Sequence, residues 1–240
     1  EHKLFDQETE NAMEAFSKLG AQSNAYTSFD QTVYLFSCTD RFNENLKLLL
    51  NFVQNPYFTD ESVENEKGII GQEIRMYQDD ADWRAYFNLL DALYKNHPVK
   101  KDIAGSIDSI SKIDKELLYK CYNTFYSPHN MIVLVVGDLE AEEVFDLVDA
   151  EVKVQSSQTE IKRFFTHEPQ EVNQAIVEQT MQVAIPIFQI GFKDDVSNLT
   201  PQEYIKRELT IKMILDIVMG RSTEFYDELY SQNLINDSFS

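Results

Sequence analysis

The sequence is poor in positive charge and contains no long apolar run. Lys and Arg together number 21 against 41 Asp and Glu, so the 240 residues carry a formal net charge of −20. This excess of negative charge disfavours nucleic acid or an anionic membrane surface as the main partner. No apolar run approaches the ~18–20 residues that a transmembrane helix needs. We therefore expect neither a nucleic-acid partner nor a membrane span.

The chain also lacks the short motifs of several common enzyme classes. It contains no G-x-G-x-x-G or G-x-x-x-x-G-K-[ST] segment, which disfavours nucleotide binding, and no G-x-S-x-G segment for a serine nucleophile. The two cysteines, Cys38 and Cys121, are far apart and do not have the spacing of a metal site. We expect both to be buried, reduced thiols of a cytoplasmic protein.

The patterns that are present predict an α+β fold. Apolar residues make up 43% of the chain, which is enough for a real core. Residues 20–38 have the partial alternation of two strands joined by a turn near residues 28–30. MIVLVVGD, residues 131–138, has the composition of a short buried strand. The spacing of apolar residues predicts helices over 3–19, 40–54, 63–78, 82–95, 113–126 and 140–152.

Composition divides the chain into three parts. Residues 1–152 are expected to form a first domain that lacks its first segment. The polar stretch 153–175 has no clear periodicity and is predicted to be a linker. Residues 176–240 offer about one strand pair, within 176–192, and two helices. That is too little for a complete domain, so we expect an incomplete second domain of the same kind.

Two acidic residues on one predicted helix are the strongest internal feature. Glu66 and Glu73 in ENEKGIIGQEIRMYQ are seven residues apart, which places both carboxylates on one helix face, ~10 Å apart along the axis. Such a pair in an acidic chain is usually part of a solvated stripe. Gly68 and Gly71 are poor helix formers, and we expect them to let another element approach the helix closely at a shared site.

Glu1 and His2 begin the sequence with a dipeptide found in zinc peptidases. Such enzymes place two His and an activating Glu on one helix, with a third ligand from elsewhere. In the inverted arrangement, H-x-x-E-H, the Glu immediately precedes the second His. Glu1 and His2 would be its last two positions, and its first His would stand three residues before Glu1, outside these 240 residues. Taken alone, any Glu-His dipeptide fits this pattern.

The order of four segments resembles one family of enzymes. EHKLFD, GAQSNAYTSFDQTVYLF, ENEKGIIGQEI and YSPHNMIVLVVGD follow one another like the landmarks of the insulinase/pitrilysin family of zinc peptidases. The resemblance covers nearly the whole chain and is closest to the bacterial two-subunit, processing-peptidase-like branch. It implies α+β domains of mainly antiparallel sheet flanked by helices. It also implies two halves that close into a chamber for short or unfolded peptides.

The resemblance implies roles for the acidic residues and the histidine. Glu1 matches the general base that takes a proton from zinc-bound water, and His2 matches the second zinc ligand. Glu73 matches the third zinc ligand. Glu66 matches the acid that supports the site, through an outer-shell hydrogen bond.

The resemblance also implies how a substrate binds and what a partner supplies. Asn24, Ala25 and Tyr26, followed by Thr27, resemble the edge strand to which substrate peptides add by main-chain pairing. Family enzymes often carry an Arg and a Tyr, seven residues apart, near the scissile carbonyl. The corresponding stretch here has Tyr230 and Asp237 instead. A homologous partner subunit is therefore expected to supply the Arg/Tyr pair.

These expectations describe a zinc-dependent endopeptidase that hydrolyses peptides or unfolded polypeptides through metal-activated water. Because the first His lies outside the 240 residues, we expect this chain alone to bind zinc weakly or not at all and to be inactive. The alternative is a non-catalytic subunit of a two-subunit peptidase, which shapes the chamber or binds peptides. A third interpretation is a purely structural domain with a chance Glu-His dipeptide.

Overall fold

The structure is a computed structural model that describes the chain except for residues 9, 154–160, 165, 238 and 240. The chain forms two compact units, Glu1–Gly191 and Phe192–Ser240. The predicted boundaries at 152 and 176 stay a prediction, and residues 154–160 and 165 of the predicted linker lie outside the described residues. The elements of the first unit are η1 (His2–Leu4), α1 (Ala12–Lys18), β1 (Gln22–Thr27), β2 (Thr32–Ser37), α2 (Phe42–Gln54), α3 (Asp60–Asp79), α4 (Ala81–Leu93), η2 (Pro98–Lys100), α5 (Ile107–Ser111), α6 (Lys115–Phe125), η3 (Pro128–Asn130) and α7 (Ala141–Glu151).

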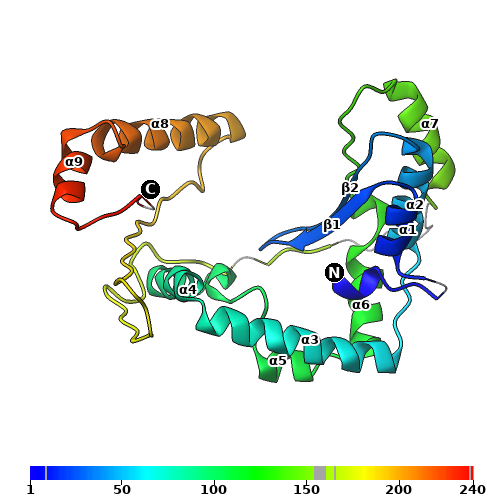
Figure 1. Cartoon of the computed structure of the whole chain (residues 1–240), viewed down its shortest axis with the longest axis horizontal. Helices are drawn as coiled ribbons and strands as arrows, with labels where there is room; N and C mark the ends of the chain where they lie inside the picture. The colour runs from blue at the N-terminus through cyan, green and yellow to red at the C-terminus, as the bar shows by residue number, and fades with distance from the viewer. Residues whose placement is uncertain (9, 154–160, 165, 238, 240) are drawn as a thin grey trace. The chain divides into compact units, whose positions relative to one another are not determined.

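The sheet of the first unit is an antiparallel hairpin of β1 and β2, against which α1 and α2 pack (Figure 1). The strands pair in register from Gln22 opposite Ser37 to Thr27 opposite Thr32. The Ser28 main-chain N–H donates to the Gln31 carbonyl at 2.8 Å and closes the turn where the sequence predicted it. Helices together with an antiparallel sheet confirm the α+β class.

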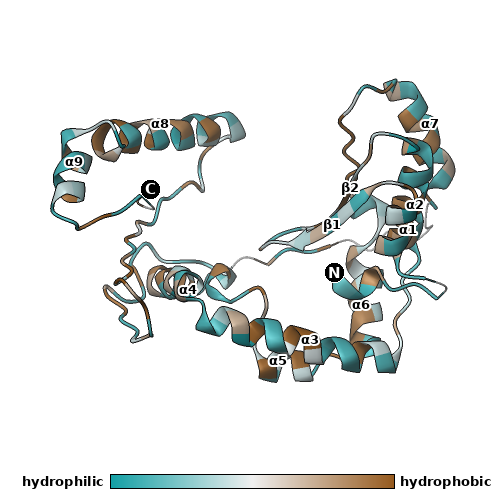
Figure 2. Cartoon of the chain, in the orientation of Figure 1, coloured by the Kyte–Doolittle hydropathy of each residue, from teal (hydrophilic) through white to brown (hydrophobic). Residues whose placement is uncertain are grey.

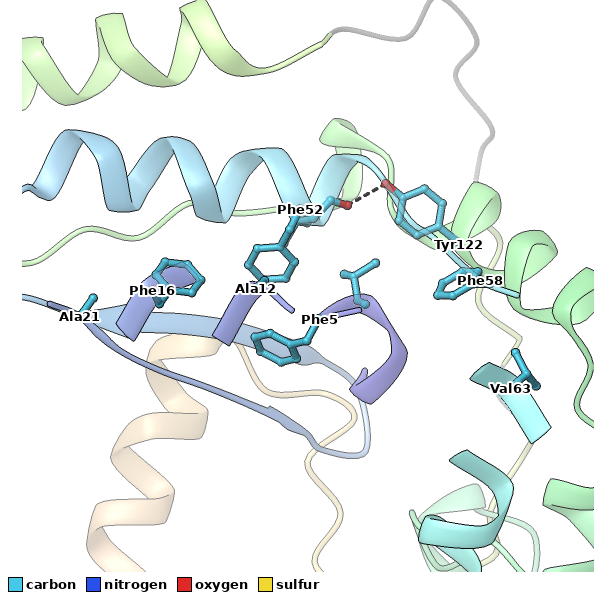
Figure 3. Packing of buried hydrophobic residues seen from close by; sticks show 10 residues of the cluster. Phe5, Ala12, Phe16, Ala21, Phe52, Phe58, Val63 and Tyr122 are labelled. Carbon is cyan, nitrogen blue, oxygen red and sulfur yellow. Dashed lines mark hydrogen bonds between the residues drawn. The ribbon is translucent and has the colours of Figure 1, made fainter. Parts of the chain in front are cut away.

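Aromatic residues form the core between the hairpin and the helices (Figure 3). The rings of Phe5 and Phe52 stack with centroids 5.2 Å apart, and Phe16 meets Phe52 edge-on at 6.0 Å. Burial of such side chains contributes about 1.5–3 kcal/mol each to stability. Leu4 and Phe5 are both buried and follow His2 by two and three residues in the chain. The core therefore fixes the turn that carries His2.

Helix α3 carries Glu66 and Glu73, the two acidic residues that the sequence singled out. Thr59 caps it through a capping box with Ser62, and Val63 and Ile74 are buried on its inner face. The helix contacts η1, α4 and α5. A Cβ at Gly71 would lie an ordinary 3.5 Å from Ile107 of α5, and a Cβ at Gly68 would meet nothing within 4 Å. The expected close approach of another element of the site at these glycines is wrong.

The predicted helix over residues 3–19 is interrupted. Its first part is the turn η1, and α1 begins only after Asn11, whose side chain accepts a hydrogen bond from the Met13 N–H. An asparagine that caps a helix start satisfies a main-chain donor locally, so the backbone does not continue the preceding turn. Gly20, at φ +78°, ends α1 as predicted.

The predicted buried strand 131–138 is wrong for this structure. Residues 131–136 are not in a strand, although the exposed fraction of their side chains alternates between lower and higher values. Ile132, Leu134 and Val136 are 94%, 83% and 90% exposed, and the run is drawn brown beside α7 (Figure 2). A strand needs main-chain partners, and the described residues place none beside this segment. The predicted strands within 176–192 are absent from the described residues for the same reason, and many of their apolar side chains are exposed.

The cysteines are free, as expected, but they are not both buried: Cys38 is half-buried and Cys121 is exposed. The prediction of two buried thiols is therefore wrong for Cys121, which lies on the outer face of α6.

The second unit contains α8 (Pro201–Met219) and α9 (Glu224–Ser231). Thr200 begins α8 with a capping box to Glu203, and Pro201 occupies the first turn, where its missing N–H costs nothing. The Arg207 guanidinium binds both carboxylate oxygens of Asp194, at 2.7 and 2.6 Å. Tyr226 of α9 is buried. Both helices lie in the part of the chain, residues 176–240, where the sequence predicted two helices.

Candidate metal and active site

The ring of His2 binds the carboxylate of Glu66. Nδ1 of His2 lies 2.9 Å from Oε1 of Glu66, across 64 residues of sequence. The Glu66 side chain is 11% exposed and the His2 side chain 43% exposed. The hydrogen bond to Glu66 is the main cause that raises the pKa of His2, and partial burial only offsets it in part. The structure thus joins η1 to α3 at the residues that the sequence singled out.

Lys3 binds the other oxygen of the same carboxylate. Its Nζ lies 3.1 Å from Oε2 of Glu66 and 2.5 Å from Oδ2 of Asp6, and its side chain is only 14% exposed. Hydrogen bonds from His2 and then from Lys3 lower the pKa of Glu66 despite its burial. An ionised carboxylate only accepts, so Nδ1 of His2 is the donor, and in the neutral ring Nε2 carries the lone pair.

Glu1 is held by the hairpin. The Thr27 hydroxyl donates to Oε2 of Glu1 at 2.7 Å. The Tyr34 hydroxyl lies 3.5 Å from the Glu1 carbonyl oxygen, and it is hydrogen-bonded to the Tyr126 hydroxyl at 2.9 Å. Burial, followed by the neighbouring Tyr126, raises the pKa of Tyr34 far above its ordinary value. The Tyr34 phenol beside Glu1 is therefore neutral, and Thr27 orients the Glu1 carboxylate.

A pocket of about 340 Å³ brings these groups together. Glu1, His2 and Glu66 line it, and so do Asn24 and Ala25 of β1. Residues predicted for four different roles thus share one cavity. The third predicted substrate contact, Tyr26, is 48% exposed on the strand and is not among the residues that line the pocket.

Glu73 lies near this pocket without lining it. Its Oε1 accepts a hydrogen bond from Tyr77 at 2.9 Å, one turn further along α3. Its charge still contributes to raising the pKa of His2. The sequence placed Glu66 and Glu73 on one helix face, and both act on His2, Glu66 by contact and Glu73 electrostatically.

The donor types of this site suit zinc, which takes imidazole nitrogen and carboxylate oxygen. A ligating His usually donates its other ring N–H to a carboxylate, and His2 and Glu66 have this arrangement. Within the part of the chain that the structure describes, no three His, Cys, Asp or Glu side chains form a cluster that could hold a metal. The described residues therefore fit zinc in kind and supply an incomplete set of ligands.

The open edge of β1 can accept another strand. The bond from Ser28 to Gln31 makes this pair the hydrogen-bonded kind, and such pairs alternate along an antiparallel ladder. Asn24 and Tyr26 therefore bond to β2, and the main-chain groups of Ala25 face the open edge. In agreement, the Ala25 N–H is bound by the Asn24 side chain at 2.9 Å. Of the predicted substrate contacts, Ala25 offers its main chain, and Asn24 and Tyr26 offer side chains.

Sequence reasoning missed Lys3 and Tyr77 and gave Thr27 only a place on the edge strand. The spacing of Tyr77, four residues after Glu73, was a usable signal because side chains at i and i+4 meet on a helix. Lys3 and Thr27 gave no such signal, since their partners are 63 and 26 residues away.

The residues expected to replace the Arg/Tyr pair are engaged within the second unit. Tyr230 stacks on Tyr226 with ring centroids 5.9 Å apart. The Asp237 carbonyl accepts a hydrogen bond from Arg221 at 2.7 Å. Among the described residues we find no helix with the length and hydropathy of a membrane span.

Comparison with known proteins establishes the family. Residues 2–106 match the family model described as insulinase (peptidase family M16), and residues 112–240 match the model described as peptidase M16 inactive domain. The chain belongs to the insulinase family of peptidases, M16, as the resemblance indicated.

Individual relatives are similar over most or all of the chain. The uncharacterized zinc protease YmfH of Bacillus subtilis is 44% identical over 242 residues, which cover 100% of this chain and 56% of that protein. A solved structure described as an M16-like peptidase from Alicyclobacillus acidocaldarius superimposes with a TM-score of 0.85 at 33% identity, over 100% of this chain and 57% of that one. A protease from Helicobacter pylori gives a TM-score of 0.66 at 25% identity, over 71% and 43% of the two chains. This chain thus spans about half the length of its relatives.

Proposed function

We propose that this chain carries most of the catalytic site of a zinc-dependent endopeptidase. The observation that supports this most is the meeting of Glu1, the His2–Glu66 pair and the edge of β1 at one pocket. His2 through Nε2 and Glu73 would bind the metal, with Glu66 as the outer-shell partner of His2. The remaining ligand would be a His upstream of Glu1, as the family resemblance implies.

Zinc supplies a bound water of lowered pKa and polarises the scissile carbonyl. The Glu1 carboxylate, oriented by Thr27, takes the proton of the attacking water and later delivers it to the leaving amine. Because Glu66 holds the Nδ1–H of His2, the lone pair of the neutral ring lies on Nε2, where zinc would bind. The Ala25 main chain aligns the peptide as an added strand, so one extended peptide bond lies beside Glu1.

Main-chain recognition suits extended peptides and unfolded polypeptides better than folded proteins. A strand pairs through its backbone, so affinity depends little on side-chain identity. We propose that a homologous subunit, of the two-subunit branch, supplies the Arg/Tyr pair, because Tyr230 and Asp237 are bound within their own unit. We place the enzyme in the cytoplasm, where Cys38 and the exposed Cys121 would stay reduced.

A second candidate function is a subunit that binds peptides without hydrolysing them. One observation favours it: residues 112–240 match a model whose description calls the domain inactive. The two candidates differ in metal content, because the edge of β1 serves both and only the peptidase needs zinc.

The test is a protein extended upstream of Glu1 through the position of the expected first His. Elemental analysis should find about one zinc per chain, and Glu73→Gln should remove most of it. Glu64→Gln is the matched control, since Glu64 lies on the same helix and pairs with Lys67 outside the site. Absence of zinc in the extended protein supports the non-catalytic candidate. Zinc that persists in Glu73→Gln means that another residue is the ligand.

A further inference from the structure

Lys3 lies behind the site without lining its pocket. Its side chain is nearly buried and its ammonium lies between two carboxylates, those of Glu66 and Asp6. A buried ammonium is costly unless charge partners compensate it. Here one partner, Glu66, is also the residue that binds His2, so the cation acts on the site through a single carboxylate.

The two carboxylate oxygens of Glu66 bind different partners. Oε1 is 2.9 Å from Nδ1 of His2 and Oε2 is 3.1 Å from Nζ of Lys3. A carboxylate held at both oxygens has little freedom to rotate. His2 and Lys3, two consecutive residues of η1, thus bind the two oxygens of one carboxylate.

The position of Lys3 is itself fixed from the other side. Oδ2 of Asp6 binds the ammonium, and Oδ1 of Asp6 accepts a hydrogen bond from Asn11 at 3.0 Å. Asn11 in turn caps α1. A continuous series of polar contacts therefore runs from the start of α1 through Asp6, Lys3 and Glu66 to His2.

We propose that Lys3 is a positioning residue that sets the tautomer of His2. By fixing the orientation of the Glu66 carboxylate, Lys3 keeps Oε1 on Nδ1 of His2, so that in the neutral ring the proton stays on Nδ1 and the lone pair on Nε2. This rests on the proposed function only where it assigns that lone pair to zinc. The tautomer itself is a property of the metal-free chain.

The test is long-range ¹H–¹⁵N NMR of the imidazoles in the whole metal-free 240-residue chain, at a pH where the rings are neutral. His2→Gln assigns the His2 signals. The wild type should show mainly the Nδ1–H form. Lys3→Met keeps the length of the side chain and removes the charge, and should lower the ratio of the two tautomers about fivefold, since Oε1 of Glu66 is then less well fixed on Nδ1 of His2 and part of their hydrogen bond is lost. Lys3→Arg should restore most of the ratio.

Two further variants separate positioning from mere stabilisation. Lys67→Met removes a lysine that lies on α3, like Glu66, but pairs with Glu64. It should leave the tautomer ratio of His2 unchanged. Asp6→Asn removes the carboxylate that holds the ammonium from the other side and should lower the tautomer ratio by a smaller factor than Lys3→Met does, so it tests the proposal if Lys3→Met does not fold. An unchanged tautomer ratio in a folded Lys3→Met, or in a folded Asp6→Asn where Lys3→Met does not fold, overturns the proposal. A wild type with the expected tautomer but no zinc in the extended protein overturns the proposed function alone.

Discussion

Tyr77 lies one helical turn after Glu73 on α3, and its hydroxyl donates a hydrogen bond to Oε1 of Glu73 at 2.9 Å. The Tyr77 ring stacks on Trp83 with centroids 4.3 Å apart, and the Trp83 indole N–H donates to Asp102 at 2.8 Å. Tyr77 is therefore held in place by its neighbours. The proposed zinc ligand has a protein partner that a metal would have to displace or share.

Removing that partner should strengthen metal binding. Tyr77→Phe keeps the stacked ring and deletes one hydrogen bond, which contributes about 1 kcal/mol, so zinc should bind about fivefold more tightly to the extended protein. Competition with a fluorescent chelator measures this affinity. Tyr86→Phe, exposed on α4, is the control. If affinity instead falls, Tyr77 supports Glu73 as an outer-shell partner and does not compete for it.

Peptide binding should depend on the main chain of one strand residue. Ala25→Pro removes an N–H that faces the open edge, and edge strands tolerate proline. Affinity for a labelled unstructured peptide, followed by fluorescence anisotropy, should fall about fivefold for the lost hydrogen bond. Asn24→Pro removes an N–H of the ladder with β2 and should lower the stability of the hairpin instead.

Equal losses of stability in the two proline variants would show that the assigned alternation of hydrogen-bonded pairs is wrong. Unchanged peptide affinity in a folded Ala25→Pro would show that peptides do not add to this edge.

The helices could be predicted from the sequence because their signals are local. Thr200, Pro201 and Glu203 specify the start of α8 within four residues. Gly20, in the left-handed region, ends α1 at the predicted residue. Such signals need no distant partner, so α2, α3, α4, α6 and α7 lie close to their predicted bounds, whereas the short α5 was not predicted.

Strands outside the hairpin could not be predicted in this way, because a strand is stable only beside another strand. The run from Met131 to Val136 has a strand's composition and burial that alternates along it, yet nothing pairs with it among the described residues. β1 and β2 succeed because a four-residue turn brings them together.

The residues of the site also differ in whether the sequence could predict them, according to whether their relationships are local or long-range. The spacing of Glu66 and Glu73 is a local property of a helix, and the structure keeps both close enough to act on His2. The contacts of Lys3 and Thr27 depend on how η1 meets α3 and the hairpin, which no spacing in the sequence encodes.

The exposed apolar run leads to a prediction about solubility. Leu134 is 83% exposed, so Leu134→Lys should change the free energy of unfolding by less than about 0.5 kcal/mol. It should also lower the self-association of the chain in static light scattering, because exposed apolar segments of strand-like sequence associate. By contrast Leu46→Ala, at a side chain only 1% exposed, should cost about 2–5 kcal/mol. A large loss of stability in Leu134→Lys would mean that this segment is buried in solution.

The last prediction concerns the end of helix α2. The Tyr122 hydroxyl donates to the Val53 carbonyl at 2.7 Å in the buried core (Figure 3). Val53 lies in the last turn of α2, where a carbonyl has no partner within the helix. Tyr122→Phe leaves this carbonyl without its partner and should cost about 1–2 kcal/mol at neutral pH, measured by urea unfolding.

This loss should depend on pH in a defined direction. Burial, followed by the neighbouring Tyr126, raises the pKa of Tyr122 to about 12, against an unfolded value of about 10. The native state therefore keeps the proton longer than the unfolded state, and the contribution of Tyr122 is complete below about pH 10 and declines as the pH rises toward 12. The stability gap between wild type and Tyr122→Phe should shrink in that window. Tyr57→Phe, at an exposed tyrosine, should show no such change, and a gap that widens with pH would contradict the buried, neutral phenol.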